Sequence, residues 1–289
     1  MGMNIFLLQV MKHILFCLSL CAALLPCRAF SYDFSSDGVY YGIANAESDT
    51  VFVTFKDSSY VSYAGAVTVP DSVMFDGKVY SVAGVGDNAF RGCAALTSVH
   101  LPDGIAYIGD DAFRGCSALR KMVFPKNLET VGYNAFGGAG LDSLFLPSKV
   151  RILEPMAFMG NKNLKYAELP DSLKFIGDYA FMDCRSLKTL NIPEYIEIIG
   201  RSAFFNCYSW GEEAHIGIEI KRIGIYAFGN CFGIKRVYCA GEMYLPYCEE
   251  RAFGDIVPVD KTLIVFPGMK KAYSRVPVWK DFKEIIEQE

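Results

Sequence analysis

The sequence contains only three histidines among its 289 residues, so few residues are available for histidine-based metal sites or catalytic triads. It also lacks a basic surplus, because 28 Lys and Arg residues stand against 32 Asp and Glu residues. The resulting net charge of −4 argues against non-specific nucleic-acid binding. No glycine-rich phosphate loop and no nucleophile elbow is present. Hydrophobic residues make up 52% of the chain, which is enough to build a folded core.

No hydrophobic run is long enough to cross a membrane as a helix. The apolar run Ile14–Leu25 has 12 residues, fewer than the ~20 that a bilayer requires. Lys12 and His13 precede it and Cys27-Arg28-Ala29 follows, which is the pattern of a secretory signal peptide over residues 1–29. The alternative is a buried amphipathic helix. Cleavage after Ala29 would remove two basic residues, changing the net charge from −4 to −6, and would leave seven of the ten cysteines.

The dipeptide Ala-Phe recurs along most of the chain at nearly constant spacing. Its phenylalanines lie at positions 90, 113, 136, 158, 181, 204, 228 and 253. An Ile/Val-Gly step precedes most copies, and a run of the form apolar-x-x-apolar-x-apolar-Pro, such as Leu187–Pro193, follows them. The alternation in this run predicts a short strand that ends at proline. One unit of ~23 residues cannot bury its own apolar face, so we expect the units to stack around a shared core with the phenylalanines as its spine.

These units resemble BspA-type leucine-rich repeats, also called the Treponema pallidum type, of a bacterial cell-surface family. The shared pattern is L-x-x-L-x-L-P-x-x-L-x-x-I-G-x-x-A-F-x-x-C and covers about Val67 to Phe253. The resemblance implies an α/β, β-rich, right-handed solenoid with a parallel sheet on one face. It also implies attachment to host proteins or to other cells. The sixth unit departs from the pattern at Trp210-Gly211, where it has one extra residue, so we expect a less regular coil there.

The two ends of the chain differ from the repeats and are expected to cap the solenoid. Residues 30–69 predict a small N-terminal β cap, residues 70–255 form the solenoid of about eight units, and residues 256–289 form a C-terminal cap. Within the C-terminal cap we expect Leu263–Pro267 to form a last strand. Met269–Tyr273 and Trp279–Ile286 are expected to form short helices, the second with an apolar stripe that covers the core. The alternative for that stripe is a partner-binding helix.

A column of cysteines follows the repeat phenylalanines by three residues, at positions 93, 116, 184, 207 and 231. Ala139 and Asn161 occupy the same position in two units. A single column does not give the convergent thiolates that a metal requires, so we expect no metal and no cofactor. Buried structural thiols are the main interpretation, and disulfides between adjacent turns are the alternative.

The outward positions of the predicted strands are not required for packing, and they mix aromatic, charged and polar side chains. They give the candidate ligand-binding residues His100, Lys121, Phe145, Tyr166, Glu168, Asn191, Glu213, His215, Arg236 and Tyr238. Aromatic residues and arginine are the types that anchor interfaces. We therefore expect an exported, non-enzymatic binding or adhesion module that recognises a protein or glycan, at the cell surface, secreted or in the periplasm.

Three alternatives to this interpretation remain open at the level of sequence. The outward positions could be a solvated face without a ligand, and the protein could be an envelope scaffold with no dedicated partner. An enzyme such as a glycan hydrolase would need two carboxylates about 5–10 Å apart in a cleft. No such constellation emerges from the sequence.

Overall fold

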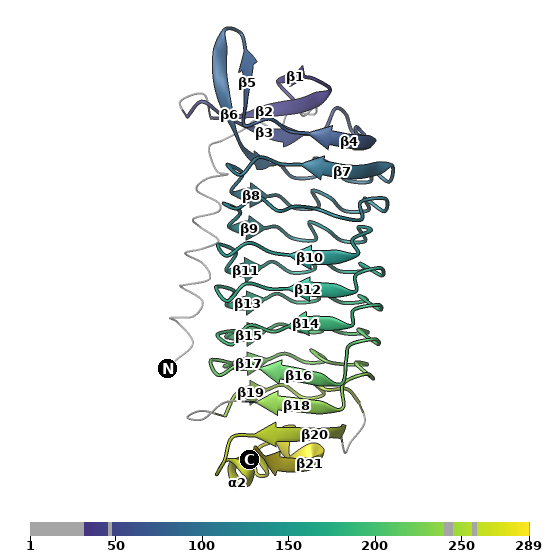
Figure 1. Cartoon of the computed structure of the whole chain (residues 1–289), viewed down its shortest axis with the longest axis vertical. Coiled ribbons are helices and arrows are strands. Elements are labelled where there is room, and N and C mark those ends of the chain that lie inside the picture. Colours follow the sequence, from purple (N-terminus) through teal and green to yellow (C-terminus); the bar gives the residue numbers. More distant parts are fainter. Residues whose placement is uncertain (1–31, 46–47, 240–244, 256–258, 289) are drawn as a thin grey trace.

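The computed structural model describes residues 32–45, 48–239, 245–255 and 259–288, and the predicted signal peptide at residues 1–29 lies outside this range. The chain winds into an elongated stack of turns with the N-terminal strands at one end and the C-terminal strands at the other (Figure 1). The repeat pattern thus predicted the architecture correctly. No helix in the described part of the chain is both long enough and apolar enough to cross a bilayer.

One parallel ladder runs along most of the stack as far as β19, on the left in Figure 1. It begins with β3 (Thr50–Thr54) and β6 (Lys78–Val85) and continues through strands of only two residues. These are β8 (Tyr107–Ile108), β9 (Thr130–Val131), β11 (Ile152–Leu153), β13 (Phe175–Ile176), β15 (Ile198–Ile199), β17 (Arg222–Ile223) and β19 (Tyr247–Cys248). Most of them end at the residue before the repeat glycine, whereas β11 and β19 are followed by glutamate. A two-residue strand has too little alternation to be recognised from sequence.

The face predicted to carry the parallel sheet contains three shorter ladders instead of one continuous ladder. The strands involved are β4 (Gly65–Thr68) and β7 (Leu96–His100), then β10 (Ser143–Phe145), β12 (Tyr166–Glu168) and β14 (Thr189–Asn191), and finally β16 (Glu213–Ile216), β18 (Arg236–Cys239), β20 (Val259–Val265) and β21 (Phe282–Glu287). The break between β14 and β16 coincides with the extra residue of the sixth unit. Below this break Tyr238 of β18 pairs with Ile264 of β20.

The repeat phenylalanines form a continuous buried column along the axis of the stack. Consecutive rings from Phe90 to Phe253 lie 4.7 to 5.6 Å apart between centroids and are nearly parallel. Tyr63 packs on the first ring at 4.6 Å and Trp279 on the last at 5.6 Å. Each turn thereby covers the aromatic ring of its neighbour, and a cap residue covers each end.

The turn around each phenylalanine uses an uncommon backbone conformation. The residue two positions before the phenylalanine is left-handed in every repeat, whether it is Asn88, Met156, Tyr179 or Arg251, with φ of 59°, 62°, 60° and 59°. This conformation costs a non-glycine residue about 1–2 kcal/mol. In the six turns from Asn88 to Ser202, the N–H of this residue donates to a carbonyl of the next turn, as in Tyr179 to Arg201 at 2.8 Å. Stacking of the turns therefore holds a conformation that an isolated repeat would not favour.

The cysteine column is buried, and each thiol is reduced. The thiols of Cys116, Cys184, Cys207 and Cys231 donate to the carbonyl oxygen of the phenylalanine in the preceding turn, at 3.0 to 3.3 Å. Burial raises the pKa of Cys184 and Cys231 to about 12. These cysteines are therefore structural donors inside the core, which agrees with the main interpretation of the sequence.

Two hairpins lie at the N-terminal end of the stack, and the second of them lies beyond residues 30–69, the range predicted for the cap. In the first, β1 (Phe34–Ser36) pairs with β2 (Val39–Asn45), and in the second β5 (Ser72–Phe75) pairs with β6. The ring of Phe34 stacks on Phe75 at 4.3 Å and joins the two hairpins. The cap is thus one packed unit that continues directly into the first turns of the solenoid.

The prediction for the C-terminal cap was correct for one helix and wrong for the other. The first is α2 (Lys270–Tyr273), but the segment predicted as a second helix forms a short 3₁₀ helix η1 (Trp279–Asp281) followed by strand β21. β21 pairs with the edge of β20, and this pairing supplies inter-strand hydrogen bonds. A short helix over the same residues is less favourable, because helix nucleation is costly. Trp279, Phe282 and Ile285 are nevertheless buried, so the stripe covers the core as expected.

Candidate functional site

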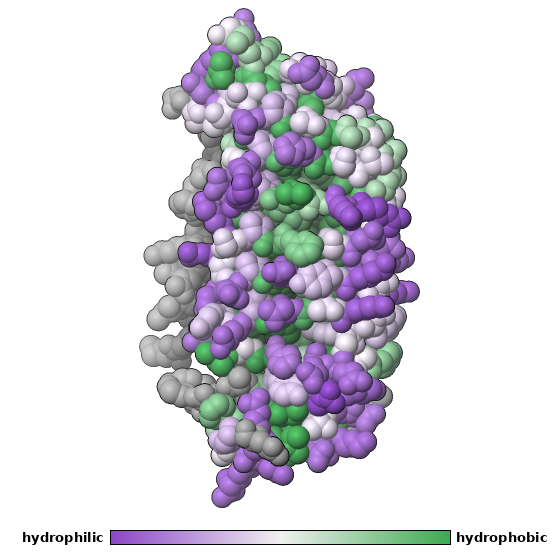
Figure 2. All heavy atoms as spheres, in the orientation of Figure 1, coloured by the Kyte–Doolittle hydropathy of each residue, from purple (hydrophilic) through white to green (hydrophobic). Residues whose placement is uncertain are grey.

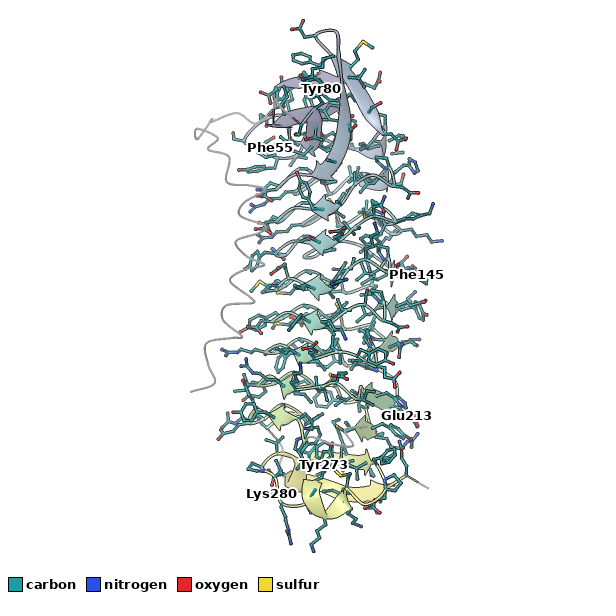
Figure 3. The ribbon with its side chains drawn as sticks, turned by 90° about the vertical axis from the view of Figure 1, so that its left-hand side faces the viewer. Phe55, Tyr80, Phe145, Glu213, Tyr273 and Lys280 are labelled. Carbon is teal, nitrogen blue, oxygen red and sulfur yellow. The ribbon has the colours of Figure 1, made fainter. Side chains whose placement is uncertain are left out.

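The candidate site is the exposed face of the strands from β7 to β18. Main-chain pairing places Tyr166 beside Ser143 and Thr189, and Arg236 beside Glu213, so neighbouring outward residues belong to successive turns. Phe145 and Glu213 point outward from the same side of the stack (Figure 3). Hydrophobic and hydrophilic surfaces alternate along this side (Figure 2). The face therefore presents mixed chemistry over several consecutive turns.

The structure brings four of the predicted residues together in a glutamate–arginine cluster on β16 and β18. Glu213 Oε1 accepts hydrogen bonds from Arg236 Nε at 2.9 Å and from Tyr238 Oη at 3.3 Å. Its other oxygen lies 3.3 Å from His215 Nε2, and the His215 ring stacks on Tyr238 with centroids 4.3 Å apart. Arg236 also contacts Glu212 at 3.2 Å. Hence one carboxylate contacts three side chains of this face, of which His215 is exposed and Arg236 and Tyr238 are half-buried.

Electrostatics in this cluster favour the ionised carboxylate. The hydrogen bonds from Arg236 and then His215 hold the pKa of Glu213 below its usual range, and the same contact with Glu213 raises the pKa of Arg236. Each charge is stabilised by a hydrogen bond to its partner. The cluster is thus a charged, pre-organised patch at neutral pH.

A second group of predicted residues lies on β10 and β12. The rings of Phe145 and Tyr166 are 5.3 Å apart, and Tyr166 Oη donates to Glu168 Oε2 at 3.0 Å, which raises the pKa of Tyr166. Phe145 is 53% exposed, and Val123 in the neighbouring turn is 81% exposed. Large apolar side chains this exposed on adjacent turns form an apolar patch that packing within the chain does not require.

The remaining predicted residues, His100, Lys121 and Asn191, are exposed on the same face. No hydrogen bond, ion pair or ring contact joins them to the other predicted site residues in the part of the chain that the structure describes. Lys121 lies in a turn whose outward segment forms no strand. These three residues share the surface but do not belong to either group.

The carboxylates of Glu212 and Glu213 both contact Arg236 and are neighbours in sequence on this face. A general acid requires a raised pKa, whereas that of Glu213 is lowered. Glu213 is therefore unsuited to the role of general acid in glycoside hydrolysis. Within the described ranges, no three His, Cys, Asp or Glu side chains converge in a way that could hold a metal ion.

Sequence reasoning missed a further row of exposed side chains, four residues after the repeat phenylalanines. There the guanidinium of Arg185 lies 5.8 Å from the Tyr208 ring, and Tyr208 stacks on Phe232 at 5.8 Å. The signal was present, because the same position reads Lys162, Arg185, Tyr208 and Phe232 in successive turns. The rings cover each other along the stack, so this row stabilises the turn corner.

Known proteins place these repeats in a family. Residues 83–211 match the sequence model described as the BspA type Leucine rich repeat region, in six copies. The chain is similar to the crystal structure of the T. pallidum Leucine Rich Repeat protein, with 26% identity over 70% of this chain and 90% of that chain and a TM-score of 0.59. A leucine-rich repeat protein from Bacteroides ovatus shares the fold, with 19% identity over 89% of this chain and 77% of that chain and a TM-score of 0.51.

No curated protein matches the chain at a significant level. The match to the repeat family rests on the same Ala-Phe turns that build the stacked core. The repeats over residues 83–211 are therefore of the BspA type of leucine-rich repeat.

Proposed function

We propose that this chain is an exported, non-enzymatic binding or adhesion module whose outward strand face recognises a protein or a glycan at the cell surface. The observation that carries the proposal is the glutamate–arginine cluster, in which Glu213 orients Arg236, His215 and Tyr238 on adjacent strands. Arginine and tyrosine are enriched at binding hot spots, and side chains that are already held in place lose less entropy on binding.

The apolar patch of Val123, Phe145 and Tyr166 supports the same proposal. It lies on the same face as the cluster, so one partner could contact both. An interface commonly combines aromatic anchors with oriented polar groups. A solvated face without a ligand would gain nothing from leaving Val123 81% exposed next to Phe145.

The test compares capture by three forms of the purified chain. The face variant carries Tyr166→Ala, Arg236→Ala and Tyr238→Ala, and the matched control carries Arg114→Ala, Tyr133→Ala and Tyr247→Ala, which are exposed side chains outside this face. Each form is applied in solution to a glycan array. In a second format each form is immobilised and exposed to surface extracts of bacterial and epithelial cells. We expect ligands that bind the wild type and the control but not the face variant.

Two outcomes of this experiment would count against the proposal. Ligands that the face variant binds as well as the wild type would refute this face as the site. Absence of any ligand on the array and in the extracts would favour the alternative of an envelope scaffold.

Export is tested separately, because it rests on residues 1–29 and on the cell-surface character of the family. Intact cells that produce the protein are treated with protease, and the released peptides are identified by mass spectrometry. We expect peptides from the exposed solenoid turns before lysis. Peptides that appear only after lysis would contradict surface display, and those released when the outer membrane alone is opened would indicate the periplasm.

A further inference from the structure

Strand β4 (Gly65–Thr68) is the first strand of the outward face, and only one of its edges is paired. It pairs in parallel with β7 through Ala66 to Ser98, Val67 to Val99 and Thr68 to His100. Its ladder contains no other strand within the described residues. In Figure 1, β4 lies just below the N-terminal hairpins and above β7. The edge away from β7 is therefore the end of the sheet.

The register determines which main-chain groups face this edge. Gly65 N–H donates to Ala95 O at 2.8 Å, and Val69 N–H donates to His100 O at 2.9 Å. Alternate residues of a parallel strand point their N–H and C=O groups to the same neighbour, so Gly65, Val67 and Val69 face β7. Ala66 and Thr68 consequently direct their N–H and C=O groups away from β7, and within the described residues these groups have no hydrogen-bond partner.

A cavity of about 250 Å³ lies against this edge. Its lining includes Ala66, Val67 and Thr68 of β4 and, at Asp37 and Gly38, the tight turn between β1 and β2. Both turn residues are left-handed, with φ of 48° and 79°, as in the two-residue hairpin turns that match strand twist. Asp37 is the only charged residue among the lining residues that the structure describes. The cavity thus combines free main-chain groups with one carboxylate.

We propose that the outer edge of β4 binds an extended peptide strand that carries a basic side chain opposite Asp37, so that the peptide becomes an additional strand of the sheet. An extended main chain is the ligand that matches alternating N–H and C=O groups along a strand edge, and this mode is known as β-strand addition. The Asp37 carboxylate selects lysine or arginine on that strand. This site lies at the end of the sheet and does not depend on the outward side chains of the proposed function.

The probe is an N-acetylated, C-amidated hexapeptide of alternating threonine and valine with one lysine, added to the purified full chain. Amide hydrogen exchange of Ala66 and Thr68 is followed by NMR. We expect both amides to exchange rapidly in the free protein, and the Thr68 N–H to slow by about tenfold or more when the peptide saturates the edge. The amide of Val67, which already faces β7, serves as the internal reference and should change little.

Three variants and two further peptides isolate the cause. Thr68→Pro removes an outward N–H without removing a donor to β7, and we expect about fivefold weaker peptide binding than for Thr68→Val, which keeps the N–H. Asp37→Asn should weaken binding of the lysine peptide. It should leave unaffected the binding of a peptide in which glutamine replaces the lysine. A peptide with N-methyl groups on alternate main-chain nitrogens removes the same hydrogen bonds from the ligand side, so the test remains valid if Thr68→Pro fails to fold.

Three results would overturn the proposal. The amides of Ala66 and Thr68 could be unaffected by saturating peptide, or the N-methylated and unmethylated peptides could bind equally well. Protection in the peptide-free protein that increases with protein concentration would show that a second copy, and not a peptide, occupies the edge.

Discussion

The side-chain amide of Asn161 donates hydrogen bonds to the carbonyl oxygens of Phe136 in the preceding turn, at 2.7 Å, and of Phe158 in its own turn, at 2.9 Å. It occupies the position where five other turns have cysteine, and four of those thiols donate to the equivalent Phe carbonyl. Replacing Asn161 with alanine should lower the free energy of unfolding by about 1–3 kcal/mol, because two buried carbonyls lose a donor. The shift of the urea midpoint measures this loss.

The matched variant Asn161→Cys tests whether the hydrogen bond itself matters. Cysteine restores one donor to Phe136 and removes the Asn161 Oδ1 atom, which is buried without a partner in the described structure. We expect Asn161→Cys to unfold at a higher urea concentration than Asn161→Ala. Equal midpoints for the two variants would show that the donor contributes nothing.

The phenylalanine column predicts that removing a buried ring lowers the free energy of unfolding far more than removing an exposed ring. Phe181 is fully buried between the rings of Phe158 and Phe204, at 5.5 and 5.6 Å. Phe181→Ala should therefore cost about 3–5 kcal/mol in the free energy of unfolding. Phe145→Ala removes the same ring from the 53% exposed position and should change stability by less than about 0.5 kcal/mol. Similar losses for both variants in urea denaturation would contradict the role of the column.

Glu154 occupies the position where most repeats have the glycine of the Ile/Val-Gly step. Burial, and then the charge of Asp110, raise the pKa of Glu154, so the folded state disfavours its ionised form. The contribution of Glu154 to stability is fully present below the pKa of the group in the unfolded chain, about 4.3. It is lost as the pH rises through the higher pKa of the group in the folded state. Glu154→Gln should therefore be more stable than the wild type at pH 7, and the difference should disappear as the pH falls to about 4.

The control for this prediction is Glu129→Gln, which removes an exposed carboxylate. Thermal unfolding of all three proteins between pH 4 and about 8 provides the measurement. A stabilising effect of Glu129→Gln equal to that of Glu154→Gln would mean that net charge, and not burial, causes the change.

The sequence predicted the stacked core because each turn repeats the same apolar positions. It did not predict the continuous ladder of two-residue strands, since Ile198 and Ile199 alone show no alternation that distinguishes a strand. Nor did it indicate the left-handed residue of each turn, because Tyr179 and Met156 are residue types that rarely adopt this conformation. Contacts between turns, which depend on the whole stack, decide both features.

The candidate site was predictable only in part for a similar reason. The repeat register identified which side chains point outward, including Glu213 and Arg236. The contacts among them depend on side-chain geometry and on Glu212, which lies one position before the predicted column. Strand β21 was missed because its apolar spacing fits a helix, whereas the open edge of β20 determines its conformation.

The contact between Arg236 and Glu213 predicts a measurable titration shift. Because Arg236 and His215 lower the pKa of Glu213, its carboxyl should titrate below the usual value of about 4.3. In Arg236→Met the titration should move to higher pH, which the ¹³C shift of the Glu213 carboxyl reports in NMR. The stabilising contribution of this group is present above the unfolded pKa and is lost as the pH falls through the folded pKa.

Arg222→Met is the control, since Arg222 contacts Glu249 on the other ladder. It should leave the Glu213 titration unchanged. An unaltered titration in Arg236→Met would contradict the cluster geometry. Overall stability should hardly change in either variant, because exposed ion pairs contribute little.

The buried cysteine column predicts thiols that do not react with alkylating reagents while the protein is folded. Burial raises the pKa of Cys184 and Cys231 to about 12, and only a thiolate reacts readily with alkylating reagents. At pH 8 we expect these two thiols to remain unmodified by iodoacetamide for as long as the chain is folded, and to react fully in urea.

Mass spectrometry of tryptic peptides measures the modification at each site, and the same maps reveal disulfides. Cys93, which lies at the N-terminal end of the column and donates to Tyr60 O at 3.5 Å, is the expected first thiol to react as the cap opens. Rapid labelling of Cys184 in the native protein would contradict a column of buried thiols. A disulfide between adjacent turns would also contradict it, because a disulfide removes the hydrogen-bond donors of both cysteines.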